Sequence, residues 1–300
     1  MKPITTLLAA TDFSATAGRA EERAALLAAE HGARLTLLHS LGGLALERLR
    51  SRLLHGYAST EARLKAHYQD ALQRLAEDLA GRWQIEVTPL LAVGQPHREI
   101  TRAAQHIGAD MVILGAMGEH PAREFFLGAT AERVIREAAM PVLVVRNEPG
   151  ETYRRVLAPL DLSAHSAAIV ELAHRIAPDA HLTLAHAFEV PFEGKLRFVG
   201  VSEEDIQRYR QEERQHAQDA LYTLANSLKE GEHADIRVMH GMPEVVIPEL
   251  LRETAADMVV VGKHGSSEIV DLFLGSMTKH LLLDAPCDVL VIPPGREAKA

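Results

Sequence analysis

The chain has 300 residues, of which 47% are hydrophobic and 24% charged, and its formal net charge is −9 at pH 7. This composition is typical of a globular protein with enough apolar surface for two cores, and the acidic balance argues against general nucleic-acid binding. A lone cysteine, Cys287, excludes an intrachain disulfide framework, and the apolar run at 4–10 is too short for a secretion signal or a membrane span. We therefore expect a cytoplasmic protein with no membrane partner.

The predicted strands of the first half are short apolar runs at 4–10, 34–39, 85–91, 110–115 and 141–146. Near-continuous apolar runs such as MVILG and PVLVV are typical of parallel strands that are covered on both faces. Helical patterns separate the strands, so the order predicts a doubly wound α/β sheet of five parallel strands.

Three helices of the first half have start signals or a clear periodicity. Ser14 is placed to cap a helix that stops at Gly32, and the stretch 44–80 has apolar residues at helical spacing. Pro96 follows Gly94 as the start of a third helix, after a tight turn. The Gly-x-Pro pattern is explained by this turn alone.

Five sequence blocks occur twice, in the same order. The pairs are 7–17 with 156–166, 34–40 with 181–187, 90–100 with 237–247, 108–119 with 255–266, and 127–145 with 274–292. The offset is 149 residues in the first pair and 147 in the later glycine-containing pairs, which indicates a duplication rather than one large sheet. We therefore predict two domains, 1–149 and 150–300, with the seam near 146–155. The second half repeats the plan, with a stretch at 190–201 that we leave unassigned and a charged helix over 202–230.

An acidic residue closes the first strand of each repeat, Asp12 in the first and Asp161 in the second. A carboxylate at the end of a parallel strand can accept hydrogen bonds from a ribose or a base. It can equally help to start the next helix, so both interpretations stay open.

Spaced glycines follow the fourth strand in both repeats. The second repeat has Gly262, Gly265 and Gly275, followed by the hydroxyl residues Ser276 and Thr278; the first has Gly115, Gly118 and Gly128, followed by Thr130. Glycine lets backbone approach a ligand, and the amides that open a helix bind anions. Each glycine alone is explained by a turn, but the same spacing in two repeats favours phosphate binding.

Other chemistry-bearing residues do not form a recognisable site. Sixteen histidines include no H-E-x-x-H set, and no metal site is predicted. His39 and His186 end the second strand of the two repeats and are interpreted as hydrogen-bonded core residues. Cys287 starts an apolar strand and is interpreted as a packed thiol.

Together, the strand-one aspartate, the Gly-x-Pro turn, the Gly-x2-Gly-x9-Gly-Ser spacing and the apolar last strand resemble the universal stress protein family. The resemblance covers nearly the whole chain. It implies two Rossmann-like sheets of order 3-2-1-4-5, with ATP between strands one and four, and fifth strands that pair in an intrachain pseudo-dimer. It also assigns the nucleoside to Asp161, with Pro159 beside it, and the phosphates to Gly262, Gly265, Gly275, Ser276 and Thr278.

The first repeat departs from this pattern. Ala10 stands in place of Pro159, and Ala129 and Ala131 replace the two hydroxyl residues, with Thr130 displaced by one position. We therefore predict that ATP, alone or with Mg²⁺ or Mn²⁺, binds mainly to the second repeat, and that Asp12, Gly115, Gly118, Gly128 and Thr130 form a weaker second site.

Three functions remain open on this sequence. The leading hypothesis is a nucleotide-responsive regulatory protein of the stress response, because no base or nucleophile stands in a recognisable catalytic arrangement. The alternatives are a slow ATP hydrolase or adenylate-transfer enzyme, and a ligand-free scaffold that binds another small molecule between the halves. Protein partners are unknown, and both a monomer and a homodimer are compatible with the sequence.

Overall fold

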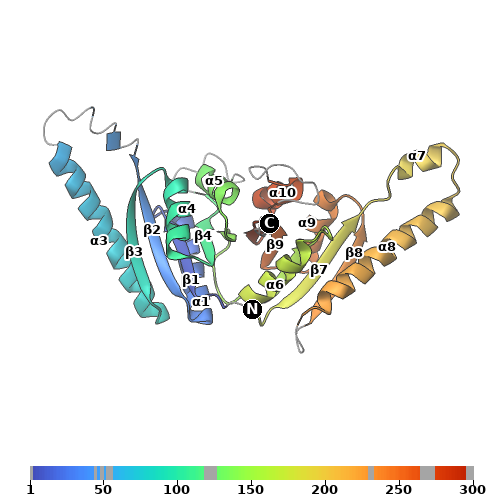
Figure 1. Cartoon of the computed structure of the whole chain (residues 1–300), viewed down its shortest axis with the longest axis horizontal. Helices are drawn as coiled ribbons and strands as arrows, with labels where there is room; N and C mark the ends of the chain where they lie inside the picture. The colour runs from blue at the N-terminus through green and yellow to red at the C-terminus, as the bar shows by residue number, and fades with distance from the viewer. Residues whose placement is uncertain are drawn as a thin grey trace, which may run out of the picture. The chain divides into compact units, whose positions relative to one another are not determined.

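The computed structural model describes residues 3–43, 46–47, 51, 57–117, 127–228, 233–263 and 274–294. The chain forms two compact units, one of Met1–Thr152 with Asp288–Pro293 and one of Tyr153–Cys287 with Pro294–Ala300. Both units alternate strands with helices (Figure 1). The last strand of the sequence therefore belongs to the first unit.

The first unit follows the predicted α/β order. Its elements are β1 (Thr6–Thr11), α1 (Ala15–His31), β2 (Arg34–Gly42), α3 (Tyr57–Trp83), β3 (Val87–Gly94), α4 (Pro96–Ile107), β4 (Met111–Gly115), α5 (Ala129–Glu137) and β5 (Val142–Val145). These five strands are parallel and lie in the order β3-β2-β1-β4-β5, which confirms the predicted 3-2-1-4-5 order.

The second unit repeats this plan. Its elements are β6 (Arg155–Pro159), α6 (Ser166–Ile176), β7 (His181–Phe188), α7 (Glu193–Phe198), α8 (Glu203–Ala225), β8 (Ala234–His240), α9 (Pro243–Glu253), β9 (Met258–Gly262) and α10 (Ser276–Asp284). The strands run β8-β7-β6-β9, again all parallel. The unassigned stretch at 190–201 contains the short helix α7.

The fifth strands of the two repeats pair with each other. β10 (Asp288–Ile292) lies antiparallel to β5, with Val289, Leu290 and Val291 opposite Val144, Leu143 and Val142. The pairing of fifth strands that the family resemblance implies is therefore confirmed. Its consequence is that the first unit has six strands, one of them antiparallel, rather than the five parallel strands expected from the repeat alone.

Helices cover both faces of each sheet. In the first unit α1 packs beside α3 on one face and α4 beside α5 on the other; in the second unit α6 packs beside α8 and α9 beside α10. Strands covered in this way lose their solvent exposure, and β4, β5, β9 and β10 are almost entirely buried. This burial explains their unbroken runs of Val, Ile and Leu.

The helix boundaries follow the signals in the sequence. The Ser14 side chain accepts a hydrogen bond from the Ala17 amide at the start of α1, and Gly32 ends that helix with φ of 62°. Gly32 favours this left-handed conformation because it has no Cβ. Pro96 and Pro243 occupy the first positions of α4 and α9, where a missing amide hydrogen has no cost.

A buried ion pair links α1 to the last strand. Arg23 Nε lies 3.4 Å from Asp288 Oδ2, and both side chains are almost fully buried. Asp288 Oδ1 also accepts hydrogen bonds from the backbone amides of Arg146 and Asn147, at the end of β5. The pair thus joins the first helix, the fifth strand and the tenth strand in one polar contact.

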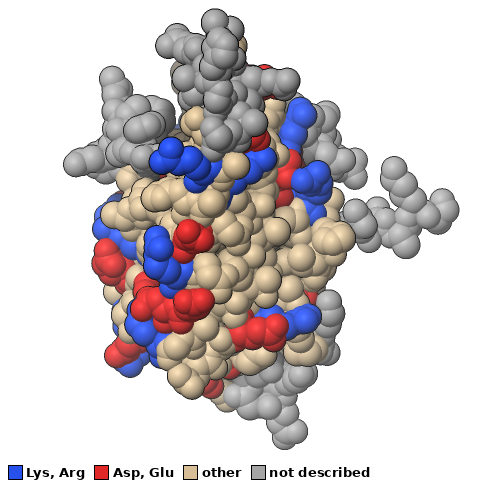
Figure 2. All heavy atoms as spheres, turned by 90° about the vertical axis from the view of Figure 1, so that its left-hand side faces the viewer, with Lys and Arg blue, Asp and Glu red and all other residues tan. Residues whose placement is uncertain are grey.

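The face of the molecule drawn in Figure 2 has acidic and basic side chains side by side and no large basic patch. Figure 2 shows the side of the first unit near α3, where Lys and Arg alternate with Asp and Glu around an uncharged area. A nucleic-acid surface would instead gather basic side chains. Among the described residues no helix combines the length and the apolar character needed to cross a membrane.

Replacing Arg23 by Met is expected to lower the free energy of unfolding by about 3–5 kcal/mol, because Asp288 would stay buried without its cationic partner. Urea denaturation measures this change. Lys65→Ala, which breaks the partly exposed Lys65–Glu61 pair on α3, serves as the control and should cost about 1 kcal/mol or less. Equal effects of the two substitutions would contradict a structural role of the buried pair.

Candidate functional site

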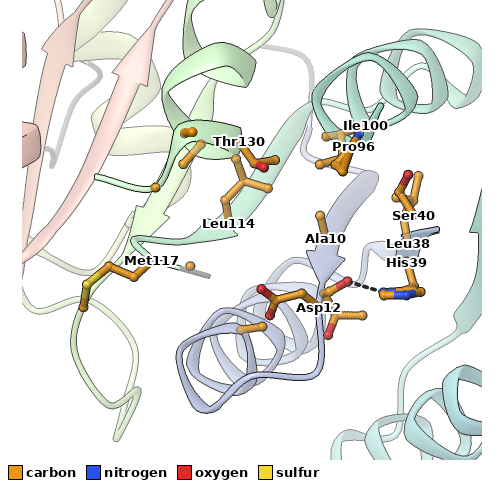
Figure 3. A pocket seen from close by; sticks show the side chains of 16 residues that line it. Ala10, Asp12, Leu38, His39, Ser40, Pro96, Ile100, Leu114, Met117 and Thr130 are labelled. Atoms are coloured by element: carbon orange, nitrogen blue, oxygen red, sulfur yellow. Dashed lines mark hydrogen bonds between the residues drawn. The ribbon is translucent and has the colours of Figure 1, made fainter. Parts of the chain in front are cut away.

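The first unit has a pocket of about 490 Å³ at the carboxyl ends of its strands. Figure 3 shows its labelled side chains converging from β1, β2, β4, α4 and α5. The pocket is lined by Ala10, Thr11, Asp12, Ala17, Leu38, His39, Ser40, Pro96, Ile100, Leu114, Gly115, Met117, Gly128, Ala129, Thr130 and Ala131. Asp12, Gly115, Gly128 and Thr130 of the predicted weaker site are therefore brought together.

The second unit has a pocket of about 440 Å³ in the equivalent place. It is lined by Pro159, Leu160, Asp161, Ile169, His186, Ala187, Pro243, Ile247, Val261, Gly262, Gly275, Ser276, Met277 and Thr278. All predicted residues of this site line the pocket except Gly265, which lies outside the described residues, as does Gly118 of the first repeat. Both volumes are in the range of small-molecule sites.

The strand-one aspartates adopt the same local turn in both units. Asp12 Oδ1 accepts a hydrogen bond from the Ser14 amide at 3.0 Å, and Asp161 Oδ1 accepts one from the Ser163 amide at 3.0 Å. The residue after each aspartate has a positive φ, 62° at Phe13 and 58° at Leu162. The two interpretations of these aspartates are compatible, because each carboxylate shapes the strand-to-helix turn and also lines its pocket.

The histidines that end the second strands are held by strand one. His39 Nδ1 lies 2.8 Å from the Thr11 carbonyl oxygen, and His186 Nδ1 lies 2.8 Å from the Leu160 carbonyl oxygen. A carbonyl oxygen only accepts hydrogen bonds, so Nδ1 carries the proton in both rings. The prediction of hydrogen-bonded histidines is confirmed, and the pockets add that both rings line a ligand-sized space.

Aromatic rings cluster beside the first pocket. The His39 ring stacks on Tyr68 of α3, with ring centroids 4.8 Å apart, and the Phe13 ring centroid also lies 4.8 Å from that of His39. Phe13 and Tyr68 were not predicted as site residues. Tyr68 belongs to a separate helix, α3, and its contact with His39 depends on how that helix packs. The apolar position of Tyr68 in that helix was the available signal, and it fits core packing equally well.

Gly115 is required by the fold as well as by the pocket. A Cβ at this position would lie 2.7 Å from the backbone oxygen of Thr16, at the start of α1. The Thr16 hydroxyl in turn donates a hydrogen bond to the Met117 carbonyl at 2.8 Å. The end of β4 and the first turn of α1 therefore touch backbone to backbone, which only glycine permits.

The helices that follow the glycine loops start without a capping side chain. Gly128 and Gly275 are the N-cap residues of α5 and α10, and neither can offer a side-chain acceptor to the first amides. Each glycine amide donates to a carbonyl at the end of the preceding strand, Ala116 or Lys263. The first turn of each helix lines its pocket, and among the described residues no side chain caps its amides, the arrangement that binds anions.

The hydroxyls of the second pocket have partners within the protein. Thr278 Oγ1 donates to the Gly262 carbonyl oxygen at 2.7 Å and is buried, so it fastens α10 to the end of β9. Ser276 Oγ donates to Glu244 Oε1 of α9 at 2.9 Å. Glu244 was not predicted as part of the site, because its contact with Ser276 depends on how two helices pack.

A buried acid lies beneath the first pocket. Glu21 of α1 is only 6% exposed, and its Oε1 has no hydrogen-bond partner in the described part of the chain. Burial raises the pKa of Glu21, with smaller contributions from Glu22 and Asp12, while a hydrogen bond with Thr11 acts in the opposite direction. The equivalent residue of the second repeat is Val170, so this acid belongs to the first unit alone.

A metal centre is not formed by the described residues, among which no three His, Cys, Asp or Glu side chains come together suitably. Cys287 is fully buried, in agreement with its interpretation as a packed thiol. Each pocket therefore offers a carboxylate, a histidine ring, apolar walls and an open helix start.

Two doubly wound units, each with a pocket where its first and fourth strands end, define a tandem Rossmann-like α/β protein. The model of the Universal stress protein family matches residues 3–146 and again 152–293, so the chain belongs to that family. A universal stress protein of Thermus aquaticus is 35% identical over 141 residues, which are 47% of this chain and 98% of that protein.

A further relative and a solved structure are also similar to this chain. The universal stress protein MJ0577 of Methanocaldococcus jannaschii is 27% identical over 153 residues, covering 47% of this chain and 94% of that protein. The crystal structure of a universal stress protein from Archaeoglobus fulgidus aligns over 97% of this chain and 98% of its own, with a TM-score of 0.68 and 19% identity. The last comparison shows that the tandem fold is shared.

Gly115→Ala should destabilise the protein by about 1–3 kcal/mol, because the new methyl group would overlap the Thr16 backbone. Gly81→Ala in α3 is the matched control, since nothing lies within 4 Å of a Cβ there, and it should stabilise by about 0.5–1 kcal/mol. Chemical denaturation of both variants measures the change. If Gly115→Ala leaves the free energy of unfolding unchanged, glycine is not required for the close contact between β4 and α1.

Glu21→Gln should stabilise the protein more at pH 7 than near pH 4. The folded-state pKa of Glu21 is raised, so the unfolded state loses its proton first and stability falls as pH rises above about 4.5. Glutamine removes this slope. The unfolding free energies of wild type and variant should therefore move apart as pH rises from about 4 to 7. If the two plots of unfolding free energy against pH stay parallel, Glu21 has the same pKa in the folded and unfolded protein.

Proposed function

We propose that this protein is a nucleotide-binding regulatory protein of the stress response, in which ATP binds mainly in the second pocket. The supporting observation is that Asp161 and the glycine-capped start of α10 line the same pocket of about 440 Å³. A carboxylate suits ribose hydroxyls, and open helix amides suit phosphates.

Each part of ATP has a matching group in the second pocket. In this proposal Asp161 and Pro159, at the end of β6, face the nucleoside, while Gly262, Gly275 and Ser276 bring backbone groups to the phosphates. Thr278 contributes indirectly, since its bond to Gly262 fixes the orientation of the helix start. Gly265 completes the family pattern in the sequence.

The difference between the pockets supports an unequal pair of sites. The first pocket has Ala129 and Ala131 where the second has Ser276 and Thr278, so it lacks those hydroxyls. It also has the buried acid Glu21 bonded to Thr11 of strand one, at a position where the second repeat has Val170. The first pocket is therefore proposed as the weaker nucleotide site.

A regulatory role fits the chemistry of the pocket better than catalysis does. The groups that line it can hold phosphates. Ser276 is bonded to the Glu244 carboxylate, but among the described residues no third group is bonded to this pair to complete a catalytic triad. In the proposed role, nucleotide occupancy stabilises one conformation of the unit and thereby an interaction surface. The Mg²⁺ or Mn²⁺ that accompanies cellular ATP would reach this protein as part of the ligand.

Gly275→Val should reduce ATP affinity at least about tenfold, because a branched side chain at the N-cap blocks the approach of phosphate to the first amides of α10. Gly128→Val is the matched variant of the first pocket and should change the total binding far less. Isothermal titration calorimetry measures both. Undiminished ATP binding by Gly275→Val would overturn the assignment to the second pocket.

Mass spectrometry of small molecules released from freshly purified protein should detect an adenine nucleotide. A different ligand would favour the scaffold hypothesis instead. Phosphate release above background that is abolished in Gly275→Val would favour a slow ATP hydrolase.

A further inference from the structure

The carboxylate of Glu244 is bonded to Ser276, one of the residues that line the second pocket. It is in the first turn of α9, and its Oε1 accepts the Ser276 hydroxyl hydrogen at 2.9 Å. Ser276 is the first residue of α10. The carboxylate is therefore close to the amino ends of two helices, whose partial positive charge stabilises an anion.

The first unit has no such contact. The residue equivalent to Glu244 is His97, whose Nε2 lies 3.6 Å from Glu137 Oε1, and the residue equivalent to Ser276 is Ala129. Both partners of the contact are thus specific to the second repeat. The two pockets differ in a charge as well as in their hydroxyls.

The Ser276 hydroxyl has a single proton, and in this structure it is donated to Glu244. A phosphate oxygen in the same place would need that proton and would also meet the negative charge of the carboxylate. The protein therefore already has an anion of its own bonded to a hydroxyl that lines the pocket to which the proposed function assigns phosphate.

We propose that Glu244 is an internal competitor for the phosphates of a nucleotide, an inference that rests on the proposed function of the second pocket. The carboxylate occupies the Ser276 hydroxyl and repels incoming negative charge, so it sets the affinity and the charge preference of this site. The carboxylate therefore lowers the affinity for ATP more than the affinity for ligands with fewer phosphates. It does not change the binding of the nucleoside portion.

Glu244→Gln tests this proposal because it removes the charge and keeps the size and a hydrogen-bond acceptor for Ser276. ATP, titrated by calorimetry in EDTA, should bind the variant about tenfold more tightly, as expected for removing one like charge at close range in a partly solvated site. Adenosine, which has no phosphate, should bind both forms equally within about twofold. Glu249→Gln, an exposed carboxylate on the same helix, is the control and should change neither affinity.

Three results would overturn the proposal. If ATP binds wild type and Glu244→Gln equally, the carboxylate does not compete. If Glu244→Gln binds ATP more weakly only when Mg²⁺ is present, the carboxylate helps to hold the metal that accompanies ATP. If neither ATP nor adenosine binds either form, the proposed function fails together with the inference. ATP binding that appears in Glu244→Gln alone supports both.

A double-mutant cycle gives a second readout. Ser276→Ala should have little effect on ATP affinity in wild type, where the hydroxyl is engaged, and should weaken binding about fivefold in a Glu244→Ala background, where the hydroxyl is available to phosphate. Equal effects of Ser276→Ala in the two backgrounds would mean that Glu244 does not control this hydroxyl.

Discussion

The parallel pairing of the first and fourth strands of each repeat is the constraint on which both pockets depend. β1 pairs with β2 on one side and with β4 on the other, and β6 is placed in the same way between β7 and β9. The chain leaves these strands in opposite directions, with helices on opposite faces. The loops diverge where the strands end and leave a space between them. In the first unit, Gly115 lets the backbone at the start of α1 contact the end of β4, and this contact fixes one wall of the space.

Much of this arrangement is readable in the sequence. The apolar runs predicted the strands, because a strand that is buried on both faces is rich in Val, Ile and Leu. The repeated blocks predicted two equivalent units. Strand ends were less predictable: β2 and β3 run on to Gly42 and Gly94, since their pairing continues beyond the apolar runs. The short helix α7 was not predicted, as it buries no side chain and so has no apolar pattern to reveal it.

The site was predictable in its residues but not in their contacts. Asp161, Gly275 and Ser276 line one pocket as the family pattern implied. The bonds of Ser276 to Glu244 and of Thr278 to Gly262 depend on helix packing, which spacing alone does not encode. They change the account of the site: Thr278 holds the helix start, Ser276 is already engaged, and the open amides of α10 become the main feature that suits phosphate.

Duplication followed by divergence explains why two equal folds have unequal pockets. The first unit has the buried groups Glu21, Arg23 and Asp288, while the second has its hydroxyl residues and Glu244. The most direct test is a crystal structure grown with ATP. The account predicts density for adenosine beside Asp161, with phosphates at the start of α10. Nucleotide density in the first pocket alone would contradict it.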